Sequence, residues 1–237
     1  MNLESRIEEY WNSRSDQFND IRLAELHSKN AAAWQDLLQK RLPAQQPLQI
    51  LDIGTGTGFF AILLAELGHE LTGIDRSEKM IDHAHQNAAA YGISATFLQI
   101  DAEQPDFPDQ CFDVILSRNL TWTLPNVQKA YQEWHRLLKP GGQLMNFDAN
   151  YGAACFAAPK TTHSVHQGIA PDLLSECDKI KDALPISQQP RPAWDLGALK
   201  QAGFHDIRLD SDISPQVHID PELEYDNIPL FALYATK

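Results

Sequence analysis

Three glycines and three aspartates have the types and spacing of a ligand site. The glycines alternate in the segment ILDIGTGTG: Gly54, Gly56 and Gly58. Asp52 lies in the apolar stretch before them, Asp75 ends HELTGID, and Asp101 ends ATFLQID. Alternating glycines remove side chains from a turn and let a ligand approach the backbone. The carboxylates can accept hydrogen bonds from its hydroxyl or amino groups, or meet a positive charge.

The elements that position these residues alternate between strand and helix. Apolar runs predict strands at 48–54, 69–75, 95–101, 111–117 and 143–149. Helical patterns separate them, and Ser77 and Gly92 are expected to begin and end the helix after the second strand. This rhythm predicts βαβ units and a parallel sheet covered on both faces. The three aspartates should then meet at the carboxyl edge of that sheet, where open α/β folds bind ligands.

The rest of the chain divides around this α/β core. Residues 1–45 read as helices that form an N-terminal cover, and 46–149 hold the cofactor-binding core. Residues 150–190 break the rhythm and read as a lid or substrate insertion, and 191–237 return to the core sheet. Asp195 is expected to cap a short helix there, and the acid-rich segment 206–226 reads as solvated surface.

Two ligand classes use a glycine turn of this kind. A dinucleotide fingerprint has the spacing GxGxxG, but Phe59 occupies the third glycine position and Gly58 comes one place early. S-adenosylmethionine needs the same open turn for its methionine tail and ribose. Asp75 suits the ribose hydroxyls of either ligand, and Asp101 with Ala102 suits the amino group and ring nitrogen of adenine.

The segment 48–149 resembles the class I S-adenosylmethionine-dependent methyltransferases, in the small-molecule branch that includes the type 11-like enzymes. The matching motifs are ILDIGTGTG, GIDRSEKMIDHA, QIDAEQPDF, FDVILSRN and WHRLLKPGG, in this order. The resemblance implies a doubly wound, mostly parallel, Rossmann-like sheet of seven strands, with the last strand antiparallel and inserted before the sixth. FHDIRLD and FALYATK would be these two strands.

The resemblance also implies a set of binding residues for S-adenosylmethionine. The glycines would line the methionine and ribose, Asp75 the ribose, Met80 the adenine face and Asp101 the adenine amino group. An aromatic side chain of the cover would close over the cofactor. The cofactor-binding set is Asp52, Gly54, Thr55, Gly56, Gly58, Asp75, Arg76, Met80, Asp101, Ala102, Arg118, Asn119, Tyr10 and Trp11. For Arg118 and Asn119, a loop salt bridge and a turn are the alternatives to contact with the cofactor carboxylate or the substrate.

Methyl transfer from a sulfonium is an in-line displacement that mainly needs alignment of the reacting atoms. A base is needed only when the acceptor arrives protonated. Asp148, at the end of the fifth strand, is the catalytic candidate, with a loop cap as its alternative. Trp122 and Tyr151 are candidate substrate-binding residues, and core packing is the alternative for Trp122. The segment SRNLTWTLP lacks the Asn/Asp-Pro-Pro-Tyr signature of methyltransferases that act on DNA or glutamine.

The composition restricts the class of substrate and the cellular compartment that we expect. The net charge is −13 with no Lys/Arg cluster, which argues against a nucleic-acid partner and favours a small molecule. Cys111, Cys155 and Cys177 are far apart, which fits a reducing cytoplasm. No signal peptide or membrane span is expected. His163 and His166 with Cys155 invite a metal site, but a third ligand is not identifiable and no metal is predicted.

The leading hypothesis is a cytoplasmic S-adenosylmethionine-dependent methyltransferase acting on a small molecule. The alternatives are a nicotinamide oxidoreductase of related fold and a non-catalytic protein that binds S-adenosylmethionine. A nucleic-acid methyltransferase is disfavoured by the charge. The sequence carries no signal for an oligomeric state.

Overall fold

A seven-stranded sheet forms the centre of the computed structural model, which describes residues 2–44, 47–157 and 168–237. The strand order is β3-β2-β1-β4-β5-β7-β6, and β7 runs antiparallel to both of its neighbours. The topology predicted from the sequence is therefore confirmed. The strands are β1 Gln49–Ile53, β2 Glu70–Asp75, β3 Thr96–Gln99, β4 Phe112–Arg118, β5 Leu138–Ala149, β6 His205–Asp210 and β7 Leu230–Thr236.

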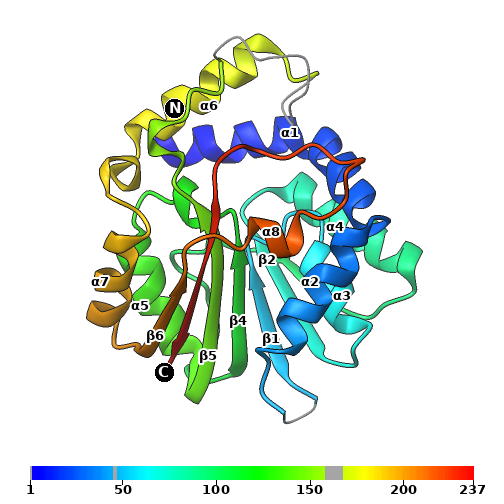
Figure 1. The fold of residues 1–237 in the computed structure, drawn as a ribbon, viewed down its shortest axis with the longest axis vertical. Helices are drawn as coiled ribbons and strands as arrows, with labels where there is room; N and C mark the ends of the chain where they lie inside the picture. The colour runs from blue at the N-terminus through cyan, green and yellow to red at the C-terminus, as the bar shows by residue number, and fades with distance from the viewer. Residues whose placement is uncertain (1, 45–46, 158–167) are drawn as a thin grey trace.

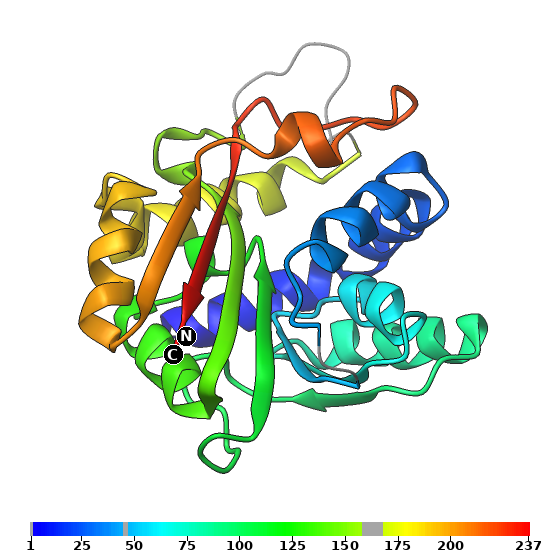
Figure 2. The ribbon, with the colours of Figure 1, turned by 60° about the horizontal axis from the view of Figure 1, so that its bottom comes forward.

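Helices cover both faces of the sheet, as Figure 2 shows. One face carries α2 Lys29–Gln39, α3 Phe59–Ala65 and α4 Glu78–Tyr91, and the other carries α5 Val127–Leu137 and α7 Ala193–Ala202. The remaining helices and 3-10 turns are α1 Leu3–Leu26, α6 Pro171–Ala183, α8 Ser214–Val217, η1 Thr121–Thr123, η2 Tyr151–Ala153 and η3 Pro185–Gln188.

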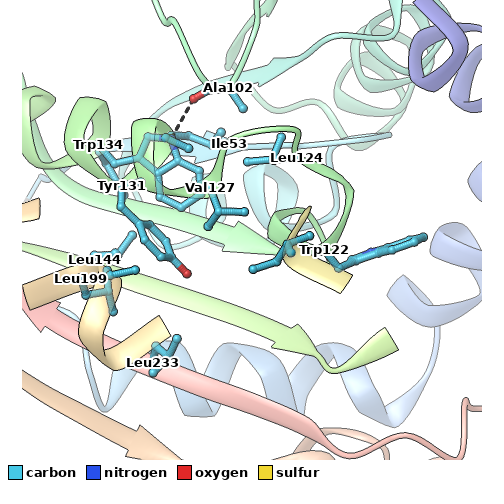
Figure 3. Packing of buried hydrophobic residues seen from close by; sticks show 14 of the residues in the cluster. Ile53, Ala102, Trp122, Leu124, Val127, Tyr131, Trp134, Leu144, Leu199 and Leu233 are labelled. Atoms are coloured by element: carbon cyan, nitrogen blue, oxygen red, sulfur yellow. Dashed lines mark hydrogen bonds between the residues drawn. The ribbon is translucent and has the colours of Figure 1, made fainter. Parts of the chain in front are cut away.

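Successive residues of the central strands belong alternately to two hydrophobic clusters, one on each face of the sheet. Ile50 and Leu116 pack with the α2–α3–α4 layer, whereas Leu51 and Ile115 pack with the α5–α7 layer. Both faces of the central strands are therefore apolar, as expected of a buried parallel sheet. Within the second cluster, the Trp134 indole Nε1 donates a 2.9 Å hydrogen bond to the Ala102 carbonyl, which ties the loop after β3 to α5 (Figure 3).

Local signals set the ends of α4. The Ser77 hydroxyl accepts a hydrogen bond from the Met80 amide at 3.2 Å, and Gly92 ends the helix in the left-handed conformation with φ +66°. Both positions are those that the sequence predicts, because an N-terminal hydroxyl and a C-terminal glycine satisfy the free backbone groups of a helix.

Two expectations about later elements were wrong. Strand β5 begins at Leu138 rather than at 143, because Leu138 already pairs with Phe112 before the register shifts. Asp195 does not cap α7, whose N-cap is Pro192. It lies fully buried inside the first turn, because the Tyr131 hydroxyl and the Arg191 guanidinium both donate to its carboxylate.

Helix α1 lies across the carboxyl edge of the sheet, with α6 on its far side (Figure 1). Polar contacts fix it on two sides. Towards α4, the Ser77 hydroxyl donates to Asn12 at 2.6 Å and the Asn87 amide donates to Asn19 at 2.7 Å. Towards α6, Arg6 forms a 2.7 Å ion pair with Glu176. In the described ranges, no helix combines the length and the apolar character that a membrane crossing requires.

Candidate functional site

A cavity of about 470 Å³ opens at the carboxyl edge of the sheet, underneath α1. Its lining comes from α1, from the loops that follow β1 to β5, from Cys177 of α6 and from residues 218–230 before and at the start of β7. Ligand sites of open α/β sheets lie at this edge, and the volume is in the range of small-molecule pockets. The cavity is therefore the candidate site.

The glycine turn forms the floor of this cavity. Gly54 and Gly56 line it with φ of +70° and +53°, values that side-chain-bearing residues rarely adopt. A Cβ on Gly54 would lie 2.9 Å from the Leu120 side chain, and one on Gly56 would lie 3.1 Å from the Phe18 ring of α1. Gly58 lies outside the cavity, where it lets α3 approach Ala84 of α4.

Asp75 organises the turn from the end of β2. Its carboxylate accepts from the Gly56 amide at 3.0 Å and from the Ser77 amide at 2.9 Å. Burial raises the pKa of Asp75 to about 6 although both amides favour its charged form. This carboxylate faces the cavity and meets no cation among the described residues.

Asp52 lies below the turn rather than in the cavity. It is 2% exposed and accepts a 2.7 Å hydrogen bond from the Thr55 hydroxyl. Burial raises its pKa to about 7, and the charge of Asp75 adds to the shift. This hydrogen bond joins the end of β1 to the glycine turn, and contact of Asp52 with a cofactor stays a prediction.

The end of β3 supplies the next wall of the cavity. One oxygen of Asp101 pairs with Arg76 at 2.5 Å, and the other accepts from the Glu103 amide at 2.9 Å. Ala102 and Met80 line the same part, and Met80 is 2% exposed. The cavity therefore offers an apolar surface beside a polar edge here.

At the end of β4, Arg118 meets a carboxylate from α1. Both terminal nitrogens of Arg118 bind Glu25, at 3.2 and 2.9 Å, and Arg22 binds the same carboxylate at 2.6 Å. Burial opposes ionisation of Glu25, but the two arginines lower its pKa to about 2. Burial lowers the pKa of Arg22 to about 10. Arg118 thus forms a salt bridge, with a partner on α1 rather than in a loop, and its contact with a cofactor stays a prediction. Asn119, with φ +53°, lies beside it on the cavity wall.

Most of the predicted site residues come together in this one cavity. Those that line it are Tyr10, Trp11, Gly54, Gly56, Asp75, Arg76, Met80, Asp101, Ala102, Arg118, Asn119, Trp122 and Tyr151. Those that do not are Asp52, Thr55, Gly58 and Asp148. The rings of Trp122, Tyr151 and Phe156 form one aromatic wall, with centroids 4.8, 5.7 and 5.8 Å apart.

Asp148 is enclosed in a polar network behind that wall. It is fully buried, accepts from the amides of Trp122 at 3.0 Å and Ala149 at 2.8 Å, and also binds the Thr121 hydroxyl. Arg191 pairs with it at 3.3 Å. The structure does not bring Asp148 to the cavity, so its role as a general base stays a prediction. The observed contacts match its alternative role, in which it shapes the neighbouring loops.

The segment 206–226 was expected to be solvated surface. Residues 206–212 are exposed or half-buried, as expected. Residues His218–Asp226, called the strap below, depart from the expectation in part, because some of them turn to the cavity. His218, Tyr225 and other strap residues line the cavity. Asn30 of α2, which is fully buried, holds the strap: its side-chain oxygen accepts from the amides of Ile219 and Asp220 at 2.9 and 3.0 Å. Its side-chain nitrogen donates to the Tyr225 hydroxyl at 2.9 Å.

The sequence reasoning missed the polar residues that α1 and the strap bring to the cavity: Arg14, Arg22, Glu25, His218 and Tyr225. Within α1, one signal was present. Arg14, Arg22 and Glu25 recur at helical spacing beside Tyr10 and Phe18, so they share the inward face. In the described part of the chain, no group of three or more His, Cys, Asp or Glu is placed to hold a metal. His163 and His166 lie outside the described residues.

Comparisons with known proteins identify the family. The family model described as a methyltransferase domain matches residues 50–142. A demethylmenaquinone methyltransferase of Thermus thermophilus is 38% identical over 101 residues, which are 42% of this chain and 46% of that protein. A ubiquinone biosynthesis O-methyltransferase of Pseudomonas aeruginosa is 30% identical over 161 residues, covering 60% of this chain and 69% of that one.

A solved structure shares the fold of the chain. A methyltransferase structure from Aquifex aeolicus, described as SAM-dependent, superposes with a TM-score of 0.60 at 19% identity, covering 95% of this chain and 97% of the other. Three findings therefore agree. A methyltransferase domain model matches the segment that contains the glycine turn, the related sequences are methyltransferases, and the chain shares its fold with a SAM-dependent methyltransferase. We conclude that it belongs to the S-adenosylmethionine-dependent methyltransferases.

Proposed function

We propose that the chain transfers the methyl group of S-adenosylmethionine to a small-molecule acceptor enclosed beneath α1. The observation that carries this proposal is the close approach of Phe18 to Gly56, which roofs the glycine turn with the same helix that lines the rest of the cavity. A roof of this kind suits an acceptor that fits inside, and the net charge of −13 disfavours a nucleic acid.

The cofactor would occupy the side of the cavity formed by β1, β2 and β3. Gly54 and Gly56 would admit its methionine and ribose parts, and Asp75 would accept from the ribose hydroxyls. Met80 would lie against the adenine, and Asp101 with Ala102 would bind its polar edge. Their common position in the cavity supports this arrangement.

The acceptor would occupy the other side, against Trp122, Tyr151 and the strap. When the cofactor is bound, its sulfonium supplies the methyl group. The residues of the chain would align the acceptor with this group and exclude water, which is the main requirement of an in-line displacement. Similar proteins include a ubiquinone biosynthesis O-methyltransferase and a malonyl-(acyl-carrier protein) O-methyltransferase, so acceptors of different kinds are compatible with this family.

The proposal is tested with methyl-labelled S-adenosylmethionine. The purified protein is incubated with the small-molecule fraction of a cell extract, and separately with its protein and RNA fractions. We expect S-adenosylhomocysteine to form and the label to enter a compound of the small-molecule fraction. Label found only in protein or RNA would contradict the proposal, and binding of the cofactor without turnover in any fraction would favour a non-catalytic binding protein.

A further inference from the structure

Arg14 is a buried cation on the cavity wall that the proposed cofactor contacts do not use. Its side chain lies on α1, 6% of the residue is exposed, and its Nε has no hydrogen-bond partner among the described residues. Its one hydrogen bond in the described part of the chain is a long one, from Nη1 to the Tyr10 hydroxyl at 3.3 Å. Burial raises the pKa of Tyr10, so this partner is a neutral phenol.

Among the described residues, no carboxylate forms an ion pair with Arg14. Among the described acids of the cavity, Glu25 binds Arg22 and Arg118, and Asp101 binds Arg76. The other acids that line it are Asp75, Glu224 and Asp226, and none of these forms an ion pair with Arg14. The described residues place no Asp or Glu within ion-pair distance of Arg14, and the sequence has no acid at 1, 45–46 or 158–167. A buried guanidinium without a counter-ion is costly, so a bound anion would stabilise it.

The position of Arg14 on α1 separates it from the face of the helix that contacts α4. Asn12 and Asn19 point towards α4, where they contact Ser77 and Asn87. At 100° per residue, Arg14 lies about half a turn away from these positions. It faces α6 instead: burial raises the pKa of Cys177 to about 11, and the charge of Arg14 acts on the same thiol in the opposite direction.

The side chains near Arg14 indicate which chemical groups the rest of the ligand should have. Phe156 and Cys177 line this part of the cavity, and Phe156 belongs to the aromatic wall with Trp122 and Tyr151. These side chains suit an apolar or aromatic body. A planar guanidinium binds a carboxylate through two N–H···O bonds. The Nε of Arg14 is enclosed by protein atoms, so the terminal nitrogens would be the donors to a ligand in the cavity.

We propose that Arg14 binds a carboxylate of the methyl acceptor, which is therefore a small carboxylic acid with an apolar or aromatic body. This inference rests on the proposed function, because it assigns the acceptor side of the same cavity. Arg14 would determine specificity, and it would hold the acceptor without touching the atoms that react.

The test measures the binding of matched acids and amides to the complex with S-adenosylhomocysteine. A panel of aromatic and aliphatic carboxylic acids is compared with the corresponding primary amides by calorimetry. Each pair has nearly the same shape and differs in charge. For the acids that bind, we expect a preference over the amide of about tenfold or more, the effect of one hydrogen bond to a charged group.

Variants of Arg14 test whether this residue causes the preference for an acid over its amide. In Arg14→Gln the preference should fall below about twofold, while Arg14→Lys should keep part of it because the charge remains. The matched control is Arg6→Gln on the same helix, where the arginine pairs with Glu176 at the surface, and it should keep the full preference. Thermal unfolding of each variant verifies that it is folded.

The outcomes separate this inference from the proposed function. Equal binding of acids and amides, absence of acid binding, or an unchanged preference in Arg14→Gln would overturn it. A loss of S-adenosylhomocysteine affinity in Arg14→Gln as large as the loss of acid affinity would also overturn it, because Arg14 would then serve the cofactor carboxylate. If the wild-type protein bound no S-adenosylhomocysteine, the proposed function itself would fail.

Discussion

The Gly56 amide donates a 3.0 Å hydrogen bond to the Asp75 carboxylate, which ties the glycine turn after β1 to the end of β2. One side chain thus fixes the shape of the turn and also faces the cavity. The carboxylate that would bind the ribose is therefore already oriented before the ligand arrives, which lowers the cost of binding.

Replacement of Asp75 tests this arrangement. Asp75→Ala should weaken S-adenosylmethionine binding by about 1–3 kcal/mol, because the ribose hydroxyls and the Gly56 amide lose their acceptor. Calorimetry measures the change, and Asp36→Ala, an exposed aspartate on α2, is the control. Equal affinity in wild type and Asp75→Ala would show that the ribose binds elsewhere.

The pKa of Asp52 predicts how stability depends on pH. Burial raises this pKa from 3.8 to about 7, so between these values the folded protein holds a proton that the unfolded chain has lost. The contribution of Asp52 to stability is present at low pH and disappears as the pH rises through 7. Asp52→Asn is neutral throughout, so it should lessen the fall in melting temperature of the ligand-free protein between pH 5 and 8. Parallel melting curves of the two proteins across this interval would contradict the shift.

Replacement of Asn30 should affect the structure of the strap more than the affinity for the cofactor. Asn30→Ala leaves several buried amide and hydroxyl groups unsatisfied, so we expect a loss of stability of about 2–4 kcal/mol in urea unfolding. Hydrogen exchange in residues 218–226 should become faster, the KM for the acceptor should rise, and cofactor affinity should change little. Asn126→Ala, which removes the N-cap of α5, is the control and should cost about 1 kcal/mol without affecting the strap. Unchanged exchange in the strap of Asn30→Ala would refute the anchoring role.

Asp148→Asn distinguishes a structural role from a catalytic one. The substitution breaks a buried pair with Arg191, so we expect a destabilisation of about 3 kcal/mol and near-normal cofactor binding. Turnover per folded molecule should remain close to that of wild type. Asp195→Asn, in the same network, should behave alike. Loss of turnover in Asp148→Asn alone, at equal stability of the two variants, would favour the general base.

The parts of the fold that the sequence predicted have local causes. Ser77 and Gly92 satisfy the ends of their own helix, and the glycine turn requires positive φ whatever surrounds it. Likewise, the apolar runs of β1 and β4 report burial on both faces. The order of the seven strands followed from a resemblance, since no local signal specifies which strands pair.

The parts that sequence reasoning missed depend on contacts between distant segments. Asp195 looks like a cap until Arg191 and Tyr131 are brought to it. The strap has no hydrophobic periodicity, and its place in the cavity depends on Asn30, which lies almost 190 residues earlier. Arg14 interrupts an apolar stripe of α1, and only the cavity behind it distinguishes an inward-facing arginine from an exposed one.

The placement of α1 has a consequence for how the molecule is made. This helix leaves the ribosome before the rest of the described chain, yet its docking partners Ser77, Asn87 and Glu176 are synthesised much later. An isolated helix is only marginally stable in water, and α1 has no tertiary support until these partners emerge. The roof of the cavity is therefore completed only after α4 and α6 have been synthesised, when a helix that was translated before them docks onto both.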